Sequence, residues 1–264
     1  MFDQRIVAIG LGLSLLIVGT GLGWGVKILA EPCNIQMLYL NGILTASVPE
    51  IALTEEYANS MPTYTASQSI ELVMKPLERS STIDGVILTI DSPGGSAVAG
   101  EEFARAFERF EKPIVSVIRS SGVSAAYWAA LGTDKIFASA NSQVGSIGAT
   151  FSYTDTSKKN ADEGITYNVV SSGKFKDLGS SNKPLTAEER ALLERDVKII
   201  EKNFIDAVSA ARALAPEEVK KMADGSFMLG VMAKEKGLID EIGGIEEARE
   251  YLESQIGYAK ICEE

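Results

Sequence analysis

Three serines in the stretch VIRSSGVSAAYWAALG, residues 117–132, are the first candidates for chemistry: Ser120, Ser121 and Ser124. A serine attacks a carbonyl group only when a base takes its proton, and histidine is the usual base. The chain has no histidine among its 264 residues. Ser-His-Asp and Cys-His mechanisms are therefore excluded, as are His-ligated metal sites, and a nucleophilic serine would need another base.

A lysine can take the place of histidine if burial lowers its pKa. The ordinary pKa of a lysine is about 10.4, and bringing it to about 7 means destabilising the ammonium by roughly 4–5 kcal/mol. A closed site or an interface between chains can supply that burial. The stretch SSGKFKDLGS, residues 171–180, offers Lys174 and Lys176 in a loop rich in glycine and serine. Taken alone, most loop lysines are merely solvated.

A second requirement for acyl transfer is an oxyanion hole, and DSPGGS, residues 91–96, could provide one. It follows a predicted buried strand and precedes a predicted helix, with Gly94 and Gly95 at the turn. Glycines without a Cβ atom let backbone N–H groups approach a ligand closely. In isolation, a Gly-Gly pair is more often a plain turn, and a serine in the position of Ser124 is more often a helix N-cap.

The elements that would position these residues alternate between strand and helix. Hydrophobic patterning predicts strands at 34–44, 84–90, 113–119, 135–140 and 165–171, and helices at 66–79, 97–110, 125–131 and 185–212. This alternation predicts an α/β domain with largely parallel strands.

Several local signals refine these elements. Asn41-Gly42 predicts a turn at the end of the first strand, and Pro76 is expected to kink or shorten its helix. Thr186 and Glu189 fit a capping box, and Pro216 can open a further helix. Three phenylalanines share one face of the helix at 97–110, namely Phe103, Phe107 and Phe110.

The N-terminus predicts a membrane anchor. Residues 6–26 run for 21 positions without a charge, between Arg5 and Lys27, and about 20 apolar residues span a bilayer core. We expect a tail at 1–5, a transmembrane helix at 6–29 and a single soluble domain at 30–264. A cleaved signal peptide is the alternative, although its apolar core is normally shorter. The balanced flanking charges do not indicate the orientation.

Charge and cysteine usage narrow the partners. A formal net charge of −11 disfavours nucleic acid, because phosphate binding needs a basic surface. The two cysteines, Cys33 and Cys262, lie near the two ends of the predicted soluble domain. The simplest interpretation is two unrelated thiols. The alternative is a bridge between the ends, which requires an oxidising compartment.

Four motifs in sequence order resemble the S49 peptidase family in its short, signal-peptide-peptidase form: DSPGGS, SGVSAAYWAALGTDKIFAS, VGSIGA and SGKFKDLGS. The later GSFMLGVMAKEKGLIDEIGGIEEA is similar to the closing segment of that family, so the resemblance covers roughly residues 84–250.

Carried over by motif, the resemblance implies a role for each candidate. Ser124 would be the nucleophile, Lys176 the general base, and Ser146 a serine that hydrogen-bonds the base and orients its amine. Gly95, with Gly94 beside it, and the N–H of Ala125 would form the oxyanion hole. Ser120 and Ser121 would be turn residues, and Lys174 would occupy a variable position.

The resemblance also implies a fold and an assembly. The fold would be a crotonase- and Clp-like ββα spiral, assembled as a homo-oligomeric ring (an octamer is one such ring) in which neighbouring subunits contribute the serine and the lysine of each site. Assembly would then provide the burial that a lysine base needs. No cofactor and no metal are implied.

The function implied is a serine endopeptidase anchored in the cytoplasmic membrane with its catalytic domain on the outer side. It would degrade cleaved signal peptides and other hydrophobic peptides. The alternatives are a non-catalytic, membrane-tethered peptide-binding scaffold and a phage-type S49 maturation protease. An acyl-CoA hydratase or isomerase would share the fold, but its chemistry usually needs placed carboxylates and leaves the Ser124/Lys176 pair unexplained.

One departure from the family pattern concerns specificity. The family commonly has Gly-Gly after the nucleophile, where this chain has Ala125-Ala126. Alanine still donates an N–H, but the two methyl groups are expected to narrow the site near the scissile bond.

Overall fold

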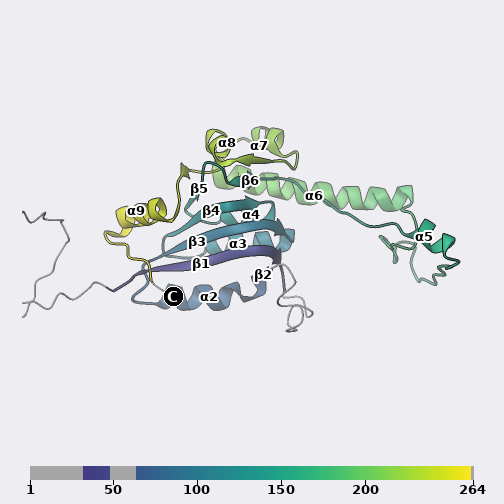
Figure 1. Cartoon of the computed structure of the whole chain (residues 1–264), viewed down its shortest axis with the longest axis horizontal. Helices are drawn as coiled ribbons and strands as arrows, with labels where there is room; N and C mark the ends of the chain where they lie inside the picture. Colours follow the sequence, from purple (N-terminus) through teal and green to yellow (C-terminus); the bar gives the residue numbers. More distant parts are fainter. Residues whose placement is uncertain (1–31, 48–63, 263–264) are drawn as a thin grey trace, which may run out of the picture. The chain divides into compact units, whose positions relative to one another are not determined.

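The computed structural model describes residues 32–47 and 64–262. Within this part, the chain forms an α/β fold around an eight-stranded sheet (Figure 1). The strands are β1 (Ile35–Thr45), β2 (Tyr64–Ala66), β3 (Gly85–Gly95), β4 (Ile114–Val123), β5 (Lys135–Ala138), β6 (Gln143–Gly145), β7 (Phe227–Leu229) and β8 (Glu241–Ile242). The helices are the 3-10 helix η2 (Ser67–Ser69), α2 (Ile70–Arg79), α3 (Ala97–Glu108), α4 (Ala125–Ala130), α5 (Ser157–Asp162), α6 (Ala187–Arg212), α7 (Pro216–Met222), α8 (Gly230–Glu235) and α9 (Ile245–Ile256).

The sheet confirms the predicted parallel topology. Its main path runs β2-β1-β3-β4-β5-β8, and every pairing along that path is parallel. Beside the end of β4 lies β6, which pairs in parallel with β4, while β7 is antiparallel to β6. The first six residues of β3 are all buried, as expected for a strand that is covered on both faces.

Two hydrophobic clusters cover the two faces of the sheet. The larger one joins residues of β3 and β4 to α3, α4 and the second half of α6. The smaller one packs Ala248 and Leu252 of α9 against other residues of the same strands. The three phenylalanines predicted to share a face, Phe103, Phe107 and Phe110, are all buried in the larger cluster.

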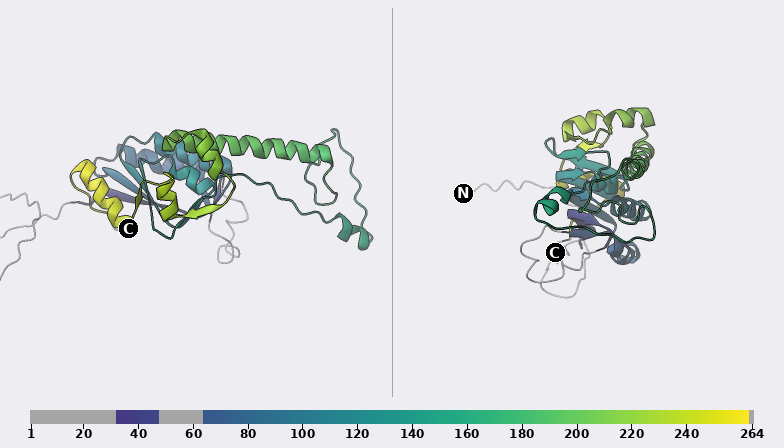
Figure 2. Two further views of the ribbon diagram at one scale, coloured as in Figure 1. Left: turned by 90° about the horizontal axis from the view of Figure 1, so that it is seen from above. Right: turned by 90° about the vertical axis from the view of Figure 1, so that its right-hand side faces the viewer.

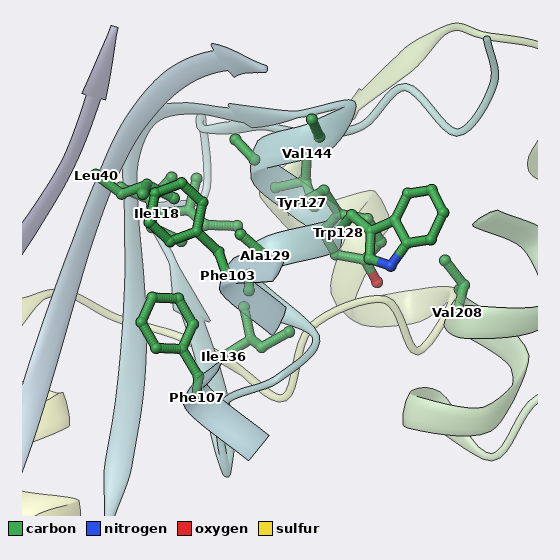
Figure 3. Close-up of a cluster of buried hydrophobic side chains, with 14 of the residues drawn as sticks. Leu40, Phe103, Phe107, Ile118, Tyr127, Trp128, Ala129, Ile136, Val144 and Val208 are labelled. Atoms are coloured by element: carbon green, nitrogen blue, oxygen red, sulfur yellow. The ribbon is translucent and has the colours of Figure 1, made fainter. Parts of the chain in front are cut away.

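The short helix α4 lies inside the larger cluster, and all six of its residues are buried. Figure 3 shows Tyr127 and Trp128 of this helix among the core side chains, with Val208 of α6 nearby. The Trp128 ring stacks on Phe204 of α6 with ring centroids 4.7 Å apart. The Tyr127 hydroxyl donates to the Leu238 carbonyl at 2.7 Å, and burial raises the pKa of this phenol. The start of α4 is therefore held rigidly.

Local signals were mostly confirmed. Thr186 and Glu189 form the predicted capping box at the start of α6, and Pro216 opens α7 at its first turn. Pro76 lies inside α2 and does not shorten it, because the helix runs on to Arg79. One expectation was wrong: β1 does not end at Asn41-Gly42 but continues to Thr45 through a bulge. Gly42 supplies the positive φ of 69° at that bulge.

The strand predicted at 165–171 is not formed. Its residues have no regular secondary structure and are all exposed, because no neighbouring strand in the described part of the chain pairs with them. A strand needs a partner for its N–H and C=O groups, so an apolar pattern alone does not produce one.

The expectation of unrelated thiols was also wrong, because Cys33 and Cys262 form a disulfide across a sequence separation of 229. The residues beside it pair as well: Ile35 and Ile261 form a parallel bridge, and the Asn34 N–H donates to the Lys260 carbonyl at 2.9 Å. The predicted tail at 1–5 and anchor at 6–29 lie outside the described residues. Among the described residues, none of the helices is both long and apolar enough to cross a membrane.

Candidate active site

Ser124 lies at a sharp turn between β4 and α4 and has a strained backbone, with φ 55° and ψ −128°. Positive φ is unusual for a residue other than glycine. Strained strand-to-helix turns of this kind present a nucleophile above a sheet. The side chain of Ser124 makes no capping hydrogen bond to α4. The N-cap interpretation therefore leaves its hydroxyl without a structural role.

Ser146 lies beside this turn. The Ser124 N–H donates to the Gly145 carbonyl at 2.7 Å, and Val123 pairs with Gly145 in the β4–β6 ladder. Ser146 itself has a positive φ of 51°, and its hydroxyl donates to the Gly225 carbonyl at 2.8 Å. A hydroxyl that donates in this way still has lone pairs that can accept from an amine. The structure thus brings the two serines of the proposed site together.

The glycine turn at the end of β3 lies against the turn that carries Ser124. A Cβ atom on Gly94 would lie 2.8 Å from the Ser124 Cβ and 2.9 Å from the Ala125 nitrogen. Only glycine allows this approach, and its φ of 91° also favours glycine. The Gly94 N–H is already bonded to the Ser92 hydroxyl at 3.0 Å. Gly94 therefore contributes close approach, and a donor from this turn has to come from Gly95.

The methyl groups of Ala125 and Ala126, which were expected to narrow the site, belong to the larger hydrophobic cluster. Both alanines are buried, at 3% and 0% exposure. The backbone and Cβ of Ala125 lie against Gly100 of α3, where an added Cβ would come within 3.1 Å of the Ala125 Cβ. The absence of a side chain at Gly100 leaves room for the methyl group of Ala125.

Lys176 lies elsewhere in the chain. Its side chain is exposed, in a turn at 174–179 within the 149–186 segment, between β6 and α6. Ion pairs join this turn to the first turn of α6: Lys174 with Glu188 at 2.5 Å, and Lys183 with both Asp177 and Glu189, at 3.3 and 2.5 Å. The hydrogen bond from Lys183 lowers the pKa of Glu189, and the same bond raises the pKa of Lys183.

The helix α6 separates this turn from Ser124. Glu189 lies in its first turn, whereas Phe204, which packs on Trp128, lies 15 residues later, or about 22 Å along the axis at 1.5 Å per residue. Figures 1 and 2 show α5, which belongs to the same 149–186 segment, beyond the end of α6 that is remote from the sheet. Within one chain, the structure brings Ser124, Ser146, Gly94, Gly95 and Ala125 together, but it does not bring Lys176 to them.

The family model for peptidase family S49 matches residues 106–258, more than half of the chain. The chain belongs to peptidase family S49. The match includes Ser124, Ser146 and Lys176, and the glycine turn at 94–95 lies just before it.

Individual relatives agree with this assignment. A protein of Methanocaldococcus jannaschii provisionally named a protease is 35% identical over 69% of this S49 chain and 59% of its own length. A protein of Enterococcus faecium provisionally named a signal peptide peptidase is 28% identical over 84% of this chain and 63% of its own. The chain thus spans about six tenths of the length of these relatives. A solved structure of a mutant of ClpP1 from Listeria monocytogenes aligns with a TM-score of 0.49 and 14% identity, over 80% of this chain and 92% of that one.

Sequence reasoning missed two residues that support the candidate site, Ser92 and Gly100. Ser92 stands between an aspartate and a proline, where a serine is typical of an ordinary turn. Gly100 falls inside a predicted helix, where glycine is unfavourable, and that local cost is the one signal of a close packing contact.

Proposed function

We propose that this S49 chain is a serine endopeptidase in which Ser124 is the nucleophile and Lys176 the general base. The observation that carries the proposal is the turn at Ser124. Ser124 has a positive φ, and its hydroxyl makes no capping hydrogen bond. Ser124 lies next to Ala125 in the chain and against the glycine turn at 94–95. Strain of this kind persists where the surrounding structure enforces it, and it concentrates at functional sites.

In the proposed reaction, the Ser124 Oγ attacks the scissile carbonyl carbon while its proton passes to the neutral Lys176 amine. The N–H groups of Gly95 and Ala125 stabilise the resulting oxyanion. The lysine then returns the proton to the leaving amine as the peptide bond breaks. Water, deprotonated by the same lysine, hydrolyses the acyl-enzyme. Ser146 accepts a hydrogen bond from the lysine amine and fixes its direction.

The lysine of each site would come from a second copy of the chain. Within one chain, the turn that carries Lys176 is paired with the first turn of α6, about 22 Å along the helix axis from Phe204, which packs on α4. A homo-oligomeric ring with shared sites reconciles this separation with the chemistry. It would also bury the lysine on assembly. The crotonase- and Clp-like spiral implied by the S49 resemblance is part of the same proposal.

The compartment and the substrates follow from other features. The disulfide between Cys33 and Cys262 supports an oxidising environment. Together with an anchor at 6–29, it favours a catalytic domain on the outer side of the cytoplasmic membrane. Cleaved signal peptides and other hydrophobic peptides would be the substrates there. A non-catalytic, membrane-tethered peptide-binding scaffold is the alternative that an assay must exclude.

The test is hydrolysis of a quenched-fluorescent peptide rich in leucine and alanine by the full chain. We expect cleavage by the parent and none by Ser124→Ala. Ser120→Ala is the matched control, because Ser120 is exposed on the same stretch and its hydroxyl donates a hydrogen bond to the Asp91 carboxylate at 2.6 Å. Equal cleavage by Ser124→Ala would refute the assignment of the nucleophile. Silence from an assembled parent would favour the scaffold.

A further inference from the structure

The strand pairing of β3 shifts register on both sides near Ser92. The register of β3 against β4 shifts between Ile90 and Ser92, and the register of β3 against β1 shifts between Asn41 and Ile43. Pairing resumes after each shift, at Ser92 with Gly122 of β4 and at Gly94 with Ile43 of β1. Where a ladder shifts register, a side chain can make the hydrogen bonds that a regular ladder would make.

The Ser92 side chain provides them. It is completely buried, at 0% exposure. Its hydroxyl donates to the Gly42 carbonyl at 2.6 Å and accepts the Gly94 N–H at 3.0 Å. A carbonyl can only accept and an N–H can only donate, so the direction of both bonds is fixed. One hydroxyl therefore ties the bulge of β1 to the turn at Pro93-Gly94.

This bond determines where the next N–H points. The Gly94 N–H and the Ser96 N–H are both bonded within the protein, the second to the Leu44 carbonyl at 2.8 Å. Gly95 lies between them, and Gly94 contacts the Ser124 Cβ and the Ala125 nitrogen at the distances given above. Fixing the peptide groups on both sides of Gly95 fixes the direction of its N–H relative to Ser124.

We propose that Ser92 is a positioning residue for the oxyanion hole. It does not touch the substrate. It holds the turn at 93–95 so that the Gly95 N–H, together with the Ala125 N–H, faces the oxygen on which negative charge develops. The inference rests on the proposed peptidase function and deepens it.

The experiment compares Ser92→Ala with the parent in the full-length protein, using the quenched-fluorescent peptide and a peptide aldehyde of the same sequence. The aldehyde carbon is attacked by the Ser124 Oγ, and the hemiacetal oxygen takes the place of the oxyanion. Removing an oxyanion donor lowers kcat by about 10²–10³, so a displaced donor should lower it by roughly 10-fold. We expect the aldehyde inhibition constant to rise by about the same factor and KM to stay within about 2-fold.

Ser116→Ala is the matched control. Ser116 is a fully buried serine of the same sheet whose hydroxyl accepts from the Thr133 hydroxyl at 3.0 Å, away from the glycine turn. Its kcat and aldehyde affinity should match those of the parent. Parent-like values in Ser92→Ala would overturn the proposal, as would an equal loss in Ser116→Ala. Ser92→Cys keeps a weak donor and acceptor of similar size, so it should be intermediate. It also carries the test if Ser92→Ala does not fold.

A readout that needs no catalysis separates this inference from the proposed function. If the Ser92 bond holds the turn, the Gly94 amide should exchange its hydrogen faster in Ser92→Ala than in the parent or in Ser116→Ala. An inactive parent would count against the peptidase assignment, whereas an unchanged Gly94 exchange rate would count against the role of Ser92.

Discussion

Backbone conformation separates the two serines of the candidate site from the other serines that the structure describes. Among the described residues, three that are not glycine have a positive φ: Ser124, Ser146 and Ala213. Ala213 ends α6 in the left-handed conformation that commonly terminates helices. The other two are the residues that the motifs assign to the nucleophile and to the partner of the base. The motifs could identify these serines, but the strain at each is visible only in the structure.

Gly94→Ala tests the close approach at the site. The new Cβ would meet the Ser124 Cβ and the Val123 carbonyl, each at 2.8 Å, on a backbone with φ 91°. We expect kcat/KM to fall by about 100-fold or more, because both the nucleophile and the oxyanion donors must shift. Gly164→Ala is the control, since Gly164 has a φ of 73° and no atom within 4 Å of the added Cβ. It should keep parent activity, and it should cost only roughly 1 kcal/mol of stability. Activity and thermal unfolding of both variants check this.

The longer helices and strands were predictable where their partners lie in the described part of the same chain. The strands at 84–90 and 113–119 and the capped helix from Thr186 appear as expected, because burial and local capping determine them. The predicted strand at 165–171 fails for the opposite reason, since its pairing is missing from the described part of the chain. The short strands β2, β6, β7 and β8 were missed because two or three residues carry no measurable periodicity.

The ion pair between Arg212 and Asp240 connects the end of α6 to the sheet, and removing it tests how much that connection stabilises the fold. Arg212, at the end of α6, donates two bonds to Asp240 at 2.8 and 2.9 Å, and Asp240 also accepts the Ile136 N–H of β5 at 2.8 Å. Burial alone would raise the pKa of Asp240, but the bonds from Arg212 and Ile136 lower it below its ordinary 3.8.

Asp240→Asn should therefore lower the free energy of unfolding at pH 7 by about 1–3 kcal/mol. Because the folded-state pKa is lowered, the stabilisation by Asp240 is fully present above pH 3.8 and is lost as the pH falls further, through the folded-state value. Denaturant unfolding of parent and variant between about pH 7 and pH 2 should show the difference shrinking on the acid side. A difference that stays constant across this range would contradict the assigned cause.

Within one chain, the proposed base Lys176 lies far from the proposed nucleophile Ser124. Motif order identified Ser124 and Lys176 together, because a sequence pattern records which residues a site uses and not which chain supplies them. The ion pairs within the 174–189 stretch are local, and they hold the turn that carries Lys176 at the start of α6 rather than beside Ser124. The distance between the two groups could be found only from the three-dimensional structure.

Mixing two inactive variants tests whether sites are shared. Ser124→Ala chains retain the lysine and Lys176→Ala chains retain the serine, so a site is complete only where the two kinds meet in the productive order. In a randomly mixed ring with head-to-tail contacts, about a quarter of the sites should be active. The measurement is peptide hydrolysis after co-expression at equal levels. Activity no higher than that of either variant alone would indicate that each chain completes its own site.

The disulfide should matter for stability more than for chemistry. It closes a loop of 229 residues between Cys33 and Cys262, and for a loop of this length the entropic stabilisation is about 5 kcal/mol, with measured losses commonly about 2–5 kcal/mol. Cys33→Ser should therefore have a free energy of unfolding lower than that of the parent by about 2–5 kcal/mol, measured by denaturant unfolding. The kcat of the folded protein should stay close to that of the parent. Unchanged unfolding would show that the pairing around Asn34 and Ile35 holds the ends without it.

The same disulfide makes the stretch from residue 33 to residue 262 a covalent circle. A single cleavage of the backbone inside this loop leaves the two parts joined by the disulfide. A protease that nicks the exposed residues between Asp162 and Lys176 would therefore leave one molecule under oxidising conditions and two fragments after reduction. After such a cut, the disulfide would still hold Ser124 and Lys176 in one covalent molecule.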